Sequence, residues 1–339
     1  MEMRDLTQHT IELAPPGRTI AEHQEFAKLA AGHGWRGAWI SELAGFDGVT
    51  QVIAAGQAIA PGRAGTAILP MQSRDPLLMA MTAASMNQLL GGRFVLGLGT
   101  STEVIIEGWH ATDWGKPLSL TREYVALLRR FLAGERVTTT DGRYRFRNAS
   151  LGNQLATDIP IYLGALNDRM LELVGEIADG ALLNFASLAY LHHARERLAT
   201  GRARAGKSMD DFEIVVYFRC SLTDDYAPVR LRYQREFLTY VMAPVYQRVW
   251  SPEGFGPMCS EVERLWRGGD REAALAAIPD ELAQERALIG TADEVRTRLG
   301  AYFDAGMHAA IVMPVARPDR DYADDCRAII TQLGDGMRE

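Results

Sequence analysis

The chain has 339 residues, of which 47% are hydrophobic and 23% charged, and its formal net charge is −7. This length suits one large domain or two ordinary ones, and the apolar content is enough for a sizeable core. The acidic balance and the lack of a long basic run argue against nucleic acid as the main partner, and no apolar run approaches the roughly 18 residues that cross a bilayer.

The cysteines and the N-terminal residues point to a compartment. Cys220, Cys259 and Cys326 are odd in number and far apart, so we expect neither a disulfide framework nor a zinc site. Residues 1–17 carry acids and no apolar segment of the signal-peptide kind. We therefore predict a cytoplasmic protein that holds no metal and does not associate with membranes.

The first hundred residues alternate strands and helices. Strands are predicted at 9–13, 35–40, 65–69 and 93–99. A helix follows each of the first three, the first of them opened by a capping box of Thr19 and Glu22. Units of roughly 30 residues predict parallel strands with right-handed crossovers. Because no GxGxxG follows the first strand, a closed (β/α)8 barrel is favoured over a doubly wound dinucleotide fold.

The rest of the chain continues this alternation with insertions. Further strands are predicted at 160–164, 181–184, 212–220 and 309–313. Insertions are expected near 100–118, 134–158 and 251–290; the second should contain a small hairpin. The third shows no strand pattern and is interpreted as a mobile or partly helical lid. The whole chain, 1–339, is thus predicted to be one α/β domain, a TIM barrel with insertions.

One stretch, residues 91–109, reads as a turn, a strand buried on both faces and a polar, glycine-containing loop. Gly99, Thr100 and Ser101 fall at the strand's carboxyl end, where parallel α/β folds place their chemistry. Glycine lets a backbone approach a ligand closely, and hydroxyls can donate to phosphate or ring oxygens. A plain strand with a glycine-rich turn explains the pattern equally well.

Five stretches resemble the luciferase-like flavin and deazaflavin oxidoreductases, and most closely the branch that uses coenzyme F420. They are WISELAGFD (39–47), GTAILPMQSRDP (65–76), GGRFVLGLGTSTEVIIEGWH (91–110), PIYLGALNDRMLELVGEIADGALLN (160–184) and GTADEVRTRLGAYFDAGMHAAIVMP (290–314). They span nearly the whole chain in the family's order. The resemblance implies a (β/α)8 barrel that binds the F420 ring at the carboxyl ends of the strands and its phosphate tail near the loop after strand five.

The resemblance nominates cofactor-binding residues in two places. After strand five, the backbone N–H groups of Gly164, Ala165, Leu166 and Asn167 would meet the phosphate at a helix N-terminus, and Arg169 would add charge. The alternative is a simple strand-to-helix cap.

In strand three the family often has a non-prolyl cis peptide in a bulge that presses on the rear of the ring. The matching bond is Ala67–Ile68, where alanine replaces the glycine often found there, and a regular strand is the alternative.

Catalytic candidates follow from strands two, four and six. Ser41 and Glu42 match a polar or acidic residue that precedes a histidine in relatives, but Leu43 occupies the histidine's place, so alcohol oxidation by that base is not expected. Ser41 is assigned to the cofactor. Glu42 would contact the ring or protonate a substrate; otherwise it caps a helix or pairs with a base.

The loop after strand four offers Glu103 as an acid if burial raises its pKa. Trp109 would stack on the substrate or is simply a packed aromatic. Asn184, after strand six, would hydrogen-bond cofactor or substrate, or cap the next helix.

The leading hypothesis is hydride transfer between F420 and a small organic substrate such as an enone, an imine or a one-carbon pterin. One alternative is an FMN-dependent monooxygenase of the same barrel, supplied with reduced cofactor by a partner reductase. Another is a cofactor-binding protein without turnover. Relatives of this type often form homodimers, and we expect the same here.

Overall fold

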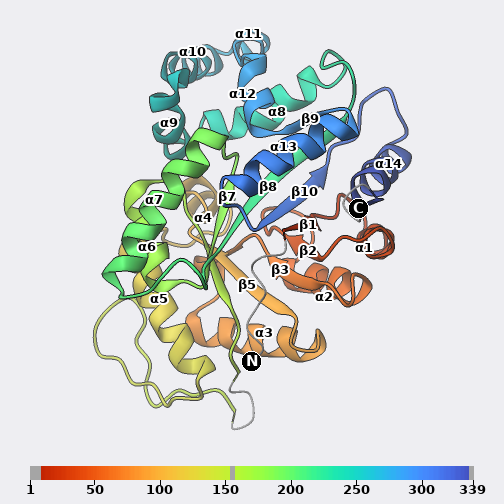
Figure 1. Cartoon of the computed structure of the whole chain (residues 1–339). Helices are drawn as coiled ribbons and strands as arrows, with labels where there is room; N and C mark the ends of the chain where they lie inside the picture. The colour runs from red at the N-terminus through yellow and green to blue at the C-terminus, as the bar shows by residue number, and fades with distance from the viewer. Residues whose placement is uncertain (1–8, 153–156, 336–339) are drawn as a thin grey trace.

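The computed structural model describes residues 9–152 and 157–335. Within them, parallel strands form a barrel that β8 and β10 close (Figure 1). The eight barrel strands are β1 (Thr10–Leu13), β2 (Gly37–Ile40), β3 (Arg63–Thr66), β5 (Phe94–Gly99), β6 (Ile161–Gly164), β7 (Gly180–Asn184), β8 (Glu213–Leu222) and β10 (Ala309–Pro314). The predicted (β/α)8 barrel is confirmed.

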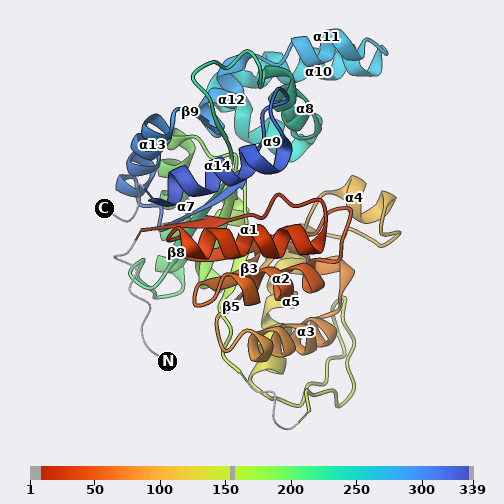
Figure 2. The same ribbon diagram turned by 90° about the vertical axis from the view of Figure 1, so that its right-hand side faces the viewer.

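Helices surround the barrel (Figures 1 and 2). They are α1 (Ile20–Gly32), α2 (Gly48–Ala58), α3 (Pro76–Leu89), α5 (Pro117–Leu132), α6 (Asp168–Ile177), α7 (Leu188–Arg204), α13 (Ala292–Asp304) and α14 (Tyr322–Asp335). The predicted capping box is present at Thr19, and a second one opens α13 at Thr291. No helix of the described ranges is both long and apolar enough to cross a membrane. Of residues 1–17, which bear on the signal-peptide prediction, 1–8 lie outside the described residues.

The barrel interior is apolar in its middle and ionic near its amino-terminal end. Trp39 and Tyr162 are buried in the middle. Below them Arg63 Nε donates to both carboxylate oxygens of Glu12, at 2.8 and 2.9 Å, and its Nη1 donates to Glu213 at 2.8 Å. Burial alone would lower the pKa of Arg63, but the two carboxylates raise it well above its usual value. These ion pairs and aromatic rings fill the lower barrel.

A block of inserted helices follows β8 and lies over the barrel in Figure 1. It consists of α8 (Arg230–Val241), α9 (Pro244–Trp250), the π-helical turn η2 (Ser251–Phe255), α10 (Gly256–Arg267), α11 (Arg271–Ala276) and α12 (Asp280–Arg286). These helices share a second hydrophobic cluster, which includes Phe237 and Trp250 and also Phe185, the residue that follows β7. The interpretation of 251–290 as partly helical is confirmed, but the segment ends in a short strand that was not predicted, β9 (Leu288–Gly290), which pairs with β8. Three residues are too short to show a strand pattern.

Two other insertions also differ from expectation. The segment after β5, read as a loop, contains a short helix, α4 (Glu103–Gly108). Figure 2 shows α4 projecting from the barrel, below α10 and α11 in that view. The hairpin predicted in 134–158 is reduced to one antiparallel bridge, between Val137 and Ala149.

Candidate functional site

The mouth of the barrel is walled by residues at the carboxyl ends of the strands. Successive residues of a strand point alternately into and out of a barrel. On the β5–β6 side the inward positions near the end are glycines, Gly97, Gly99 and Gly164. On the β7–β8 side they are large and polar, namely Asn184, Tyr217 and Arg219. The mouth therefore has one face without side chains opposite a polar face.

A bulge in strand three forms part of the glycine side. The Ala67–Ile68 peptide is cis, as predicted, and it separates β3 from β4 (Leu69–Pro70). A Cβ built on Gly99 would lie 3.0 Å from Ile68 Cγ1, and one on Gly164 would lie 3.5 Å from Ile68 Cγ2. Ile68 thus lies between two positions that carry no side chain, which suits contact with a flat ring. This arrangement fits the ring of a flavin or deazaflavin.

The bulge is held by neighbouring polar groups. Thr66 Oγ1 donates to Gly97 O at 2.7 Å and accepts from Gly97 N at 2.8 Å. Ser41 Oγ donates to Ala67 O at 2.6 Å, and the backbone N–H of Glu42 donates to Ile68 O at 3.0 Å. Ser41, predicted to contact the cofactor, is exposed at the mouth beside the bulge.

The loop after β5 is supported by two residues that the sequence analysis missed. Gln72 Nε2 donates to Thr100 O at 3.1 Å, and Trp114 Nε1 donates to the same oxygen at 2.9 Å. Ser101 beside it adopts a positive φ of 52°. Among the described residues, Gln72 Oε1 is buried without a hydrogen-bond partner. A buried acceptor of this kind suits a ligand N–H group. The polar run MQSRDP after strand three was the available signal for Gln72.

Glu42 lies in an ion pair rather than free in the mouth. Arg74 donates to both of its carboxylate oxygens, at 2.7 and 3.0 Å, and Gly48 N donates to Oε1 at 3.1 Å. The hydrogen bond to Glu42 is the main cause of the raised pKa of Arg74. This is the pairing with a base that the sequence left open. The catalytic role of Glu42 stays a prediction, and this geometry gives it no support.

We expect Glu42→Gln to lower the free energy of unfolding by about 1–3 kcal/mol, because a half-buried charged hydrogen bond is lost. The dissociation constant of the cofactor should not change. Urea denaturation and cofactor titration measure both quantities. Glu135→Gln, in an exposed pair with Arg130, is the control and should cost less than about 1 kcal/mol. Full stability combined with lost turnover would instead show that Glu42 is catalytic.

Two side chains predicted to contact the substrate, Glu103 and Trp109 in the segment after β5, are exposed. Glu103 lies in the first turn of α4, where its side chain is exposed, so the burial that its acid role requires is absent. Trp109 is 59% exposed at the end of α4. The indole that turns towards the loop is Trp114. The roles of Glu103 as an acid and of Trp109 as a substrate contact stay predictions, and the exposure of both side chains gives them no support.

The strand-to-helix turn after β6 is capped as the alternative interpretation predicted. Asn167 Oδ1 accepts from Met170 N at 3.2 Å and opens α6. Ala165 is buried, Leu166 O accepts from the Tyr190 hydroxyl, and Arg169 is exposed. The helix N-terminus remains suited to an anion through its dipole. Binding of a phosphate there stays a prediction.

A buried polar cluster on the β7–β8 side was not predicted. Asn184 Nδ2 donates to the Tyr246 hydroxyl at 2.8 Å, and its Oδ1 accepts from Arg219. Arg219 also donates to Glu236 at 3.0 Å and to the Tyr240 hydroxyl at 2.9 Å. Burial opposes the charge of Arg219, but Tyr240 and Glu236 raise its pKa above the usual value. Asn184 does not cap the next helix, because Ser187 does.

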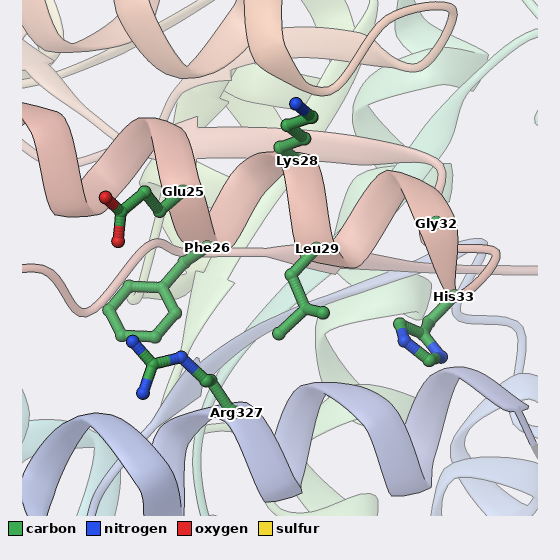
Figure 3. Close-up of a pocket in the computed structure, with 7 residues that line it drawn as sticks. All are labelled: Glu25, Phe26, Lys28, Leu29, Gly32, His33 and Arg327. Carbon is green, nitrogen blue, oxygen red and sulfur yellow. The ribbon is translucent and has the colours of Figure 1, made fainter.

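Two grooves on the outer surface contain none of the nominated residues. One, of about 430 Å³, lies between α1 and α14, where Figure 3 shows Phe26 and Leu29 pointing from α1 towards α14 and Arg327. The other, of about 590 Å³, is lined by α8, α11 and the start of α12. Neither groove therefore brings the nominated residues together.

Comparison with known proteins decides the family. The model of the luciferase-like monooxygenase family matches residues 2–309. The chain belongs to the luciferase-like monooxygenase family. A Mycobacterium tuberculosis protein with the provisional name of coenzyme F420-dependent oxidoreductase is 32% identical over 316 residues, which cover 86% of this chain and 90% of that protein.

Two further proteins are similar along most of their length. The 5,10-methylenetetrahydromethanopterin reductase of Methanolobus tindarius is 26% identical over 311 residues, which cover 91% of this chain and 94% of that enzyme. The solved structure of the coenzyme F420-dependent tetrahydromethanopterin reductase from Methanopyrus kandleri superposes with a TM-score of 0.80 at 21% identity, covering 96% of this chain and 97% of that one. At that identity the superposition shows the shared fold.

Proposed function

We propose that this luciferase-like family member is an F420-dependent oxidoreductase that transfers a hydride between the deazaflavin and a small organic substrate. The observation that carries the proposal is the surface formed by Ile68 between Gly99 and Gly164, with the unsatisfied Gln72 Oε1 close to the neighbouring loop. The names of two similar proteins support the proposal. One is named as a coenzyme F420-dependent oxidoreductase and the other as a 5,10-methylenetetrahydromethanopterin reductase.

Different residues of the mouth would contact different parts of the cofactor. Ile68 would support the ring, and the turn of Gly164–Asn167, with Arg169, would hold the phosphate. When bound, the deazaflavin supplies a two-electron hydride carrier. The chain orients the ring, provides the polar wall opposite and excludes water through the inserted helices. Leu43, 49% exposed at the mouth, supplies no base, so reduction of an unsaturated substrate fits this site better than oxidation of an alcohol.

Titration with oxidised F420 and, in parallel, with FMN tests the proposal through quenching of cofactor fluorescence. We expect a micromolar dissociation constant for F420 and weaker binding of FMN. Arg169→Ala should weaken F420 binding, whereas Arg327→Ala, in the outer groove, should not. A preference for FMN would indicate a monooxygenase, and binding of neither cofactor would refute the site. Substrate-dependent oxidation of reduced F420 then separates an enzyme from a binding protein.

We also infer a homodimer. Three apolar side chains, Leu78, Met81 and Leu89, are 46%, 48% and 56% exposed along α3. A stripe of this kind on one helix face suits contact with a second copy. We expect sedimentation equilibrium to give twice the 37.4 kDa of one chain, and Leu78→Asp combined with Met81→Asp to give the monomer. A monomeric wild-type protein would refute the inference.

A further inference from the structure

A series of hydrogen bonds joins side chains on the β7–β8 side of the mouth, and their chemistry fixes which atom donates in each. Arg219 is 6% exposed and carries only N–H groups, so Asn184 Oδ1 and the Tyr240 hydroxyl oxygen accept from it. Because Asn184 Oδ1 is thereby assigned, Asn184 Nδ2 is the atom that donates to the Tyr246 hydroxyl at 2.8 Å. Both tyrosine oxygens therefore act as acceptors within this cluster.

Each of these two tyrosines is left with a hydroxyl proton to donate. Among the residues that the structure describes, neither proton has an acceptor. Burial raises the pKa of Tyr246, which is 8% exposed, so its hydroxyl keeps the proton at neutral pH. A buried tyrosine hydroxyl usually has a hydrogen-bond partner. The cluster thus offers two O–H donors to a ligand.

The two tyrosine rings are held in place by Phe185. This residue follows β7, is 1% exposed and adopts a positive φ of 53°, which is uncommon for an aromatic residue. The centre of its ring lies 4.5 Å from that of Tyr240 and 6.2 Å from that of Tyr246. Tyr240 and Tyr246 also pack on each other, with ring centres 4.9 Å apart. The hydroxyl groups are therefore preorganised, as donors that stabilise a developing charge must be.

The cluster lies at the mouth of the barrel. Asn184 and Arg219 occupy inward positions at the ends of β7 and β8. The Tyr246 oxygen is 2.8 Å from Asn184 Nδ2, and the Tyr240 oxygen is 2.9 Å from Arg219 Nη2. Asn184 and Tyr240 are partly accessible. The two hydroxyls therefore stand on the polar side of the mouth, opposite the glycine side against which the cofactor ring is proposed to lie.

The charges of the cluster favour a neutral ligand oxygen. Arg219 Nε donates to Glu236 at 3.0 Å, so a carboxylate already offsets the positive charge of the guanidinium. A carboxylate ligand would gain little from Arg219. A carbonyl oxygen, in contrast, has two lone pairs and can accept from both tyrosine hydroxyls.

We propose that the hydroxyls of Tyr240 and Tyr246 bind the carbonyl oxygen of the substrate. This inference rests on the proposed function and narrows its substrates to ketones and conjugated enones. The hydride, lost by the reduced deazaflavin as it is oxidised, brings both electrons of the new C–H bond to the carbonyl carbon or to the conjugated β-carbon. The π pair moves to the oxygen, where the two O–H groups stabilise the developing charge. Water supplies the proton that completes the alcohol or the saturated ketone.

The first test needs no turnover. Cyclohexanone and cyclohex-2-enone, each with and without a ¹³C-labelled carbonyl, are bound to the protein that holds oxidised F420, and isotope-edited infrared spectroscopy records the C=O stretch. We expect Tyr240→Phe and Tyr246→Phe each to move the stretch to higher wavenumber, because a hydrogen bond that weakens the C=O bond is lost. A stretch that is the same in the wild type and in both variants would overturn the proposal, as would the absence of any bound probe.

The second test follows single-turnover oxidation of reduced F420 by the same two probes, and the faster probe distinguishes a ketone substrate from an enone. We expect either variant to slow this turnover at least about 100-fold, with the dissociation constant of F420 unchanged. Tyr226→Phe is the control and should change neither quantity, because Tyr226 packs against Arg230, which lines an outer groove. Unchanged turnover in both Tyr240→Phe and Tyr246→Phe would overturn the proposal and leave the proposed function standing.

Failure of the wild-type protein to bind F420 would refute the proposed function instead. If F420 binds but neither probe is reduced, the infrared result decides.

Discussion

Arg63→Met is expected to lower the free energy of unfolding by about 3–5 kcal/mol, because it removes the cation from two buried carboxylates. Glu12 is 1% exposed and Glu213 is 5% exposed, so water cannot replace the guanidinium. Urea denaturation at pH 7 measures the loss. Arg122→Met is a matched control, since Arg122 pairs with Glu176 at the surface and should cost less than about 1 kcal/mol.

Gly97→Ala is expected to disrupt the bulge and cofactor binding together. A Cβ at Gly97 would lie 1.7 Å from Thr66 O and 2.8 Å from Leu182 Cδ1, so backbone must move. Thr66 directly precedes Ala67 and Ile68, so its displacement would also move Ile68, against which the cofactor ring is proposed to lie. We expect a loss of about 3 kcal/mol in stability and at least about 10-fold weaker F420 binding.

Gly300→Ala is the control for that substitution. Gly300 lies in α13 with no atom within 4 Å of its Cβ position, so alanine there should be neutral or stabilising by up to about 1 kcal/mol. Stability and F420 fluorescence titration, measured on both variants, separate a local clash from a general intolerance of alanine. Tight F420 binding by Gly97→Ala would show that the cofactor does not lie against Ile68.

The barrel could be predicted because its signals are local. Runs such as FVLGLG in β5 are apolar on both faces, as strands of a parallel barrel require, and the Thr19 capping box lies within four residues. The cis peptide at Ala67–Ile68 came from family resemblance rather than from any property of the residues. The short strand β9 escaped prediction because three residues are too few for a periodic pattern.

The partners within the site could not be predicted because they are distant in sequence. Arg74 and Glu42, which form an ion pair, are 32 residues apart in sequence, and Arg219 and Asn184, which share a hydrogen bond, are 35 residues apart. The same is true of Arg63 and Glu213, which are 150 residues apart. The sequence therefore located the strand ends that form the mouth, whereas the pairing of Glu42 with Arg74 depends on packing between elements.

The closed lower barrel has a kinetic consequence. Since ion pairs and aromatic rings fill the amino-terminal end, a cofactor and a substrate that bind at the mouth would both enter and leave on that side of the barrel. The deazaflavin ring would lie deepest, against Ile68, and the substrate would enter over it. Binding then has a compulsory order, with the cofactor first on and last off. In steady-state kinetics, product inhibition should follow an ordered sequential pattern, and excess substrate should trap the cofactor inside.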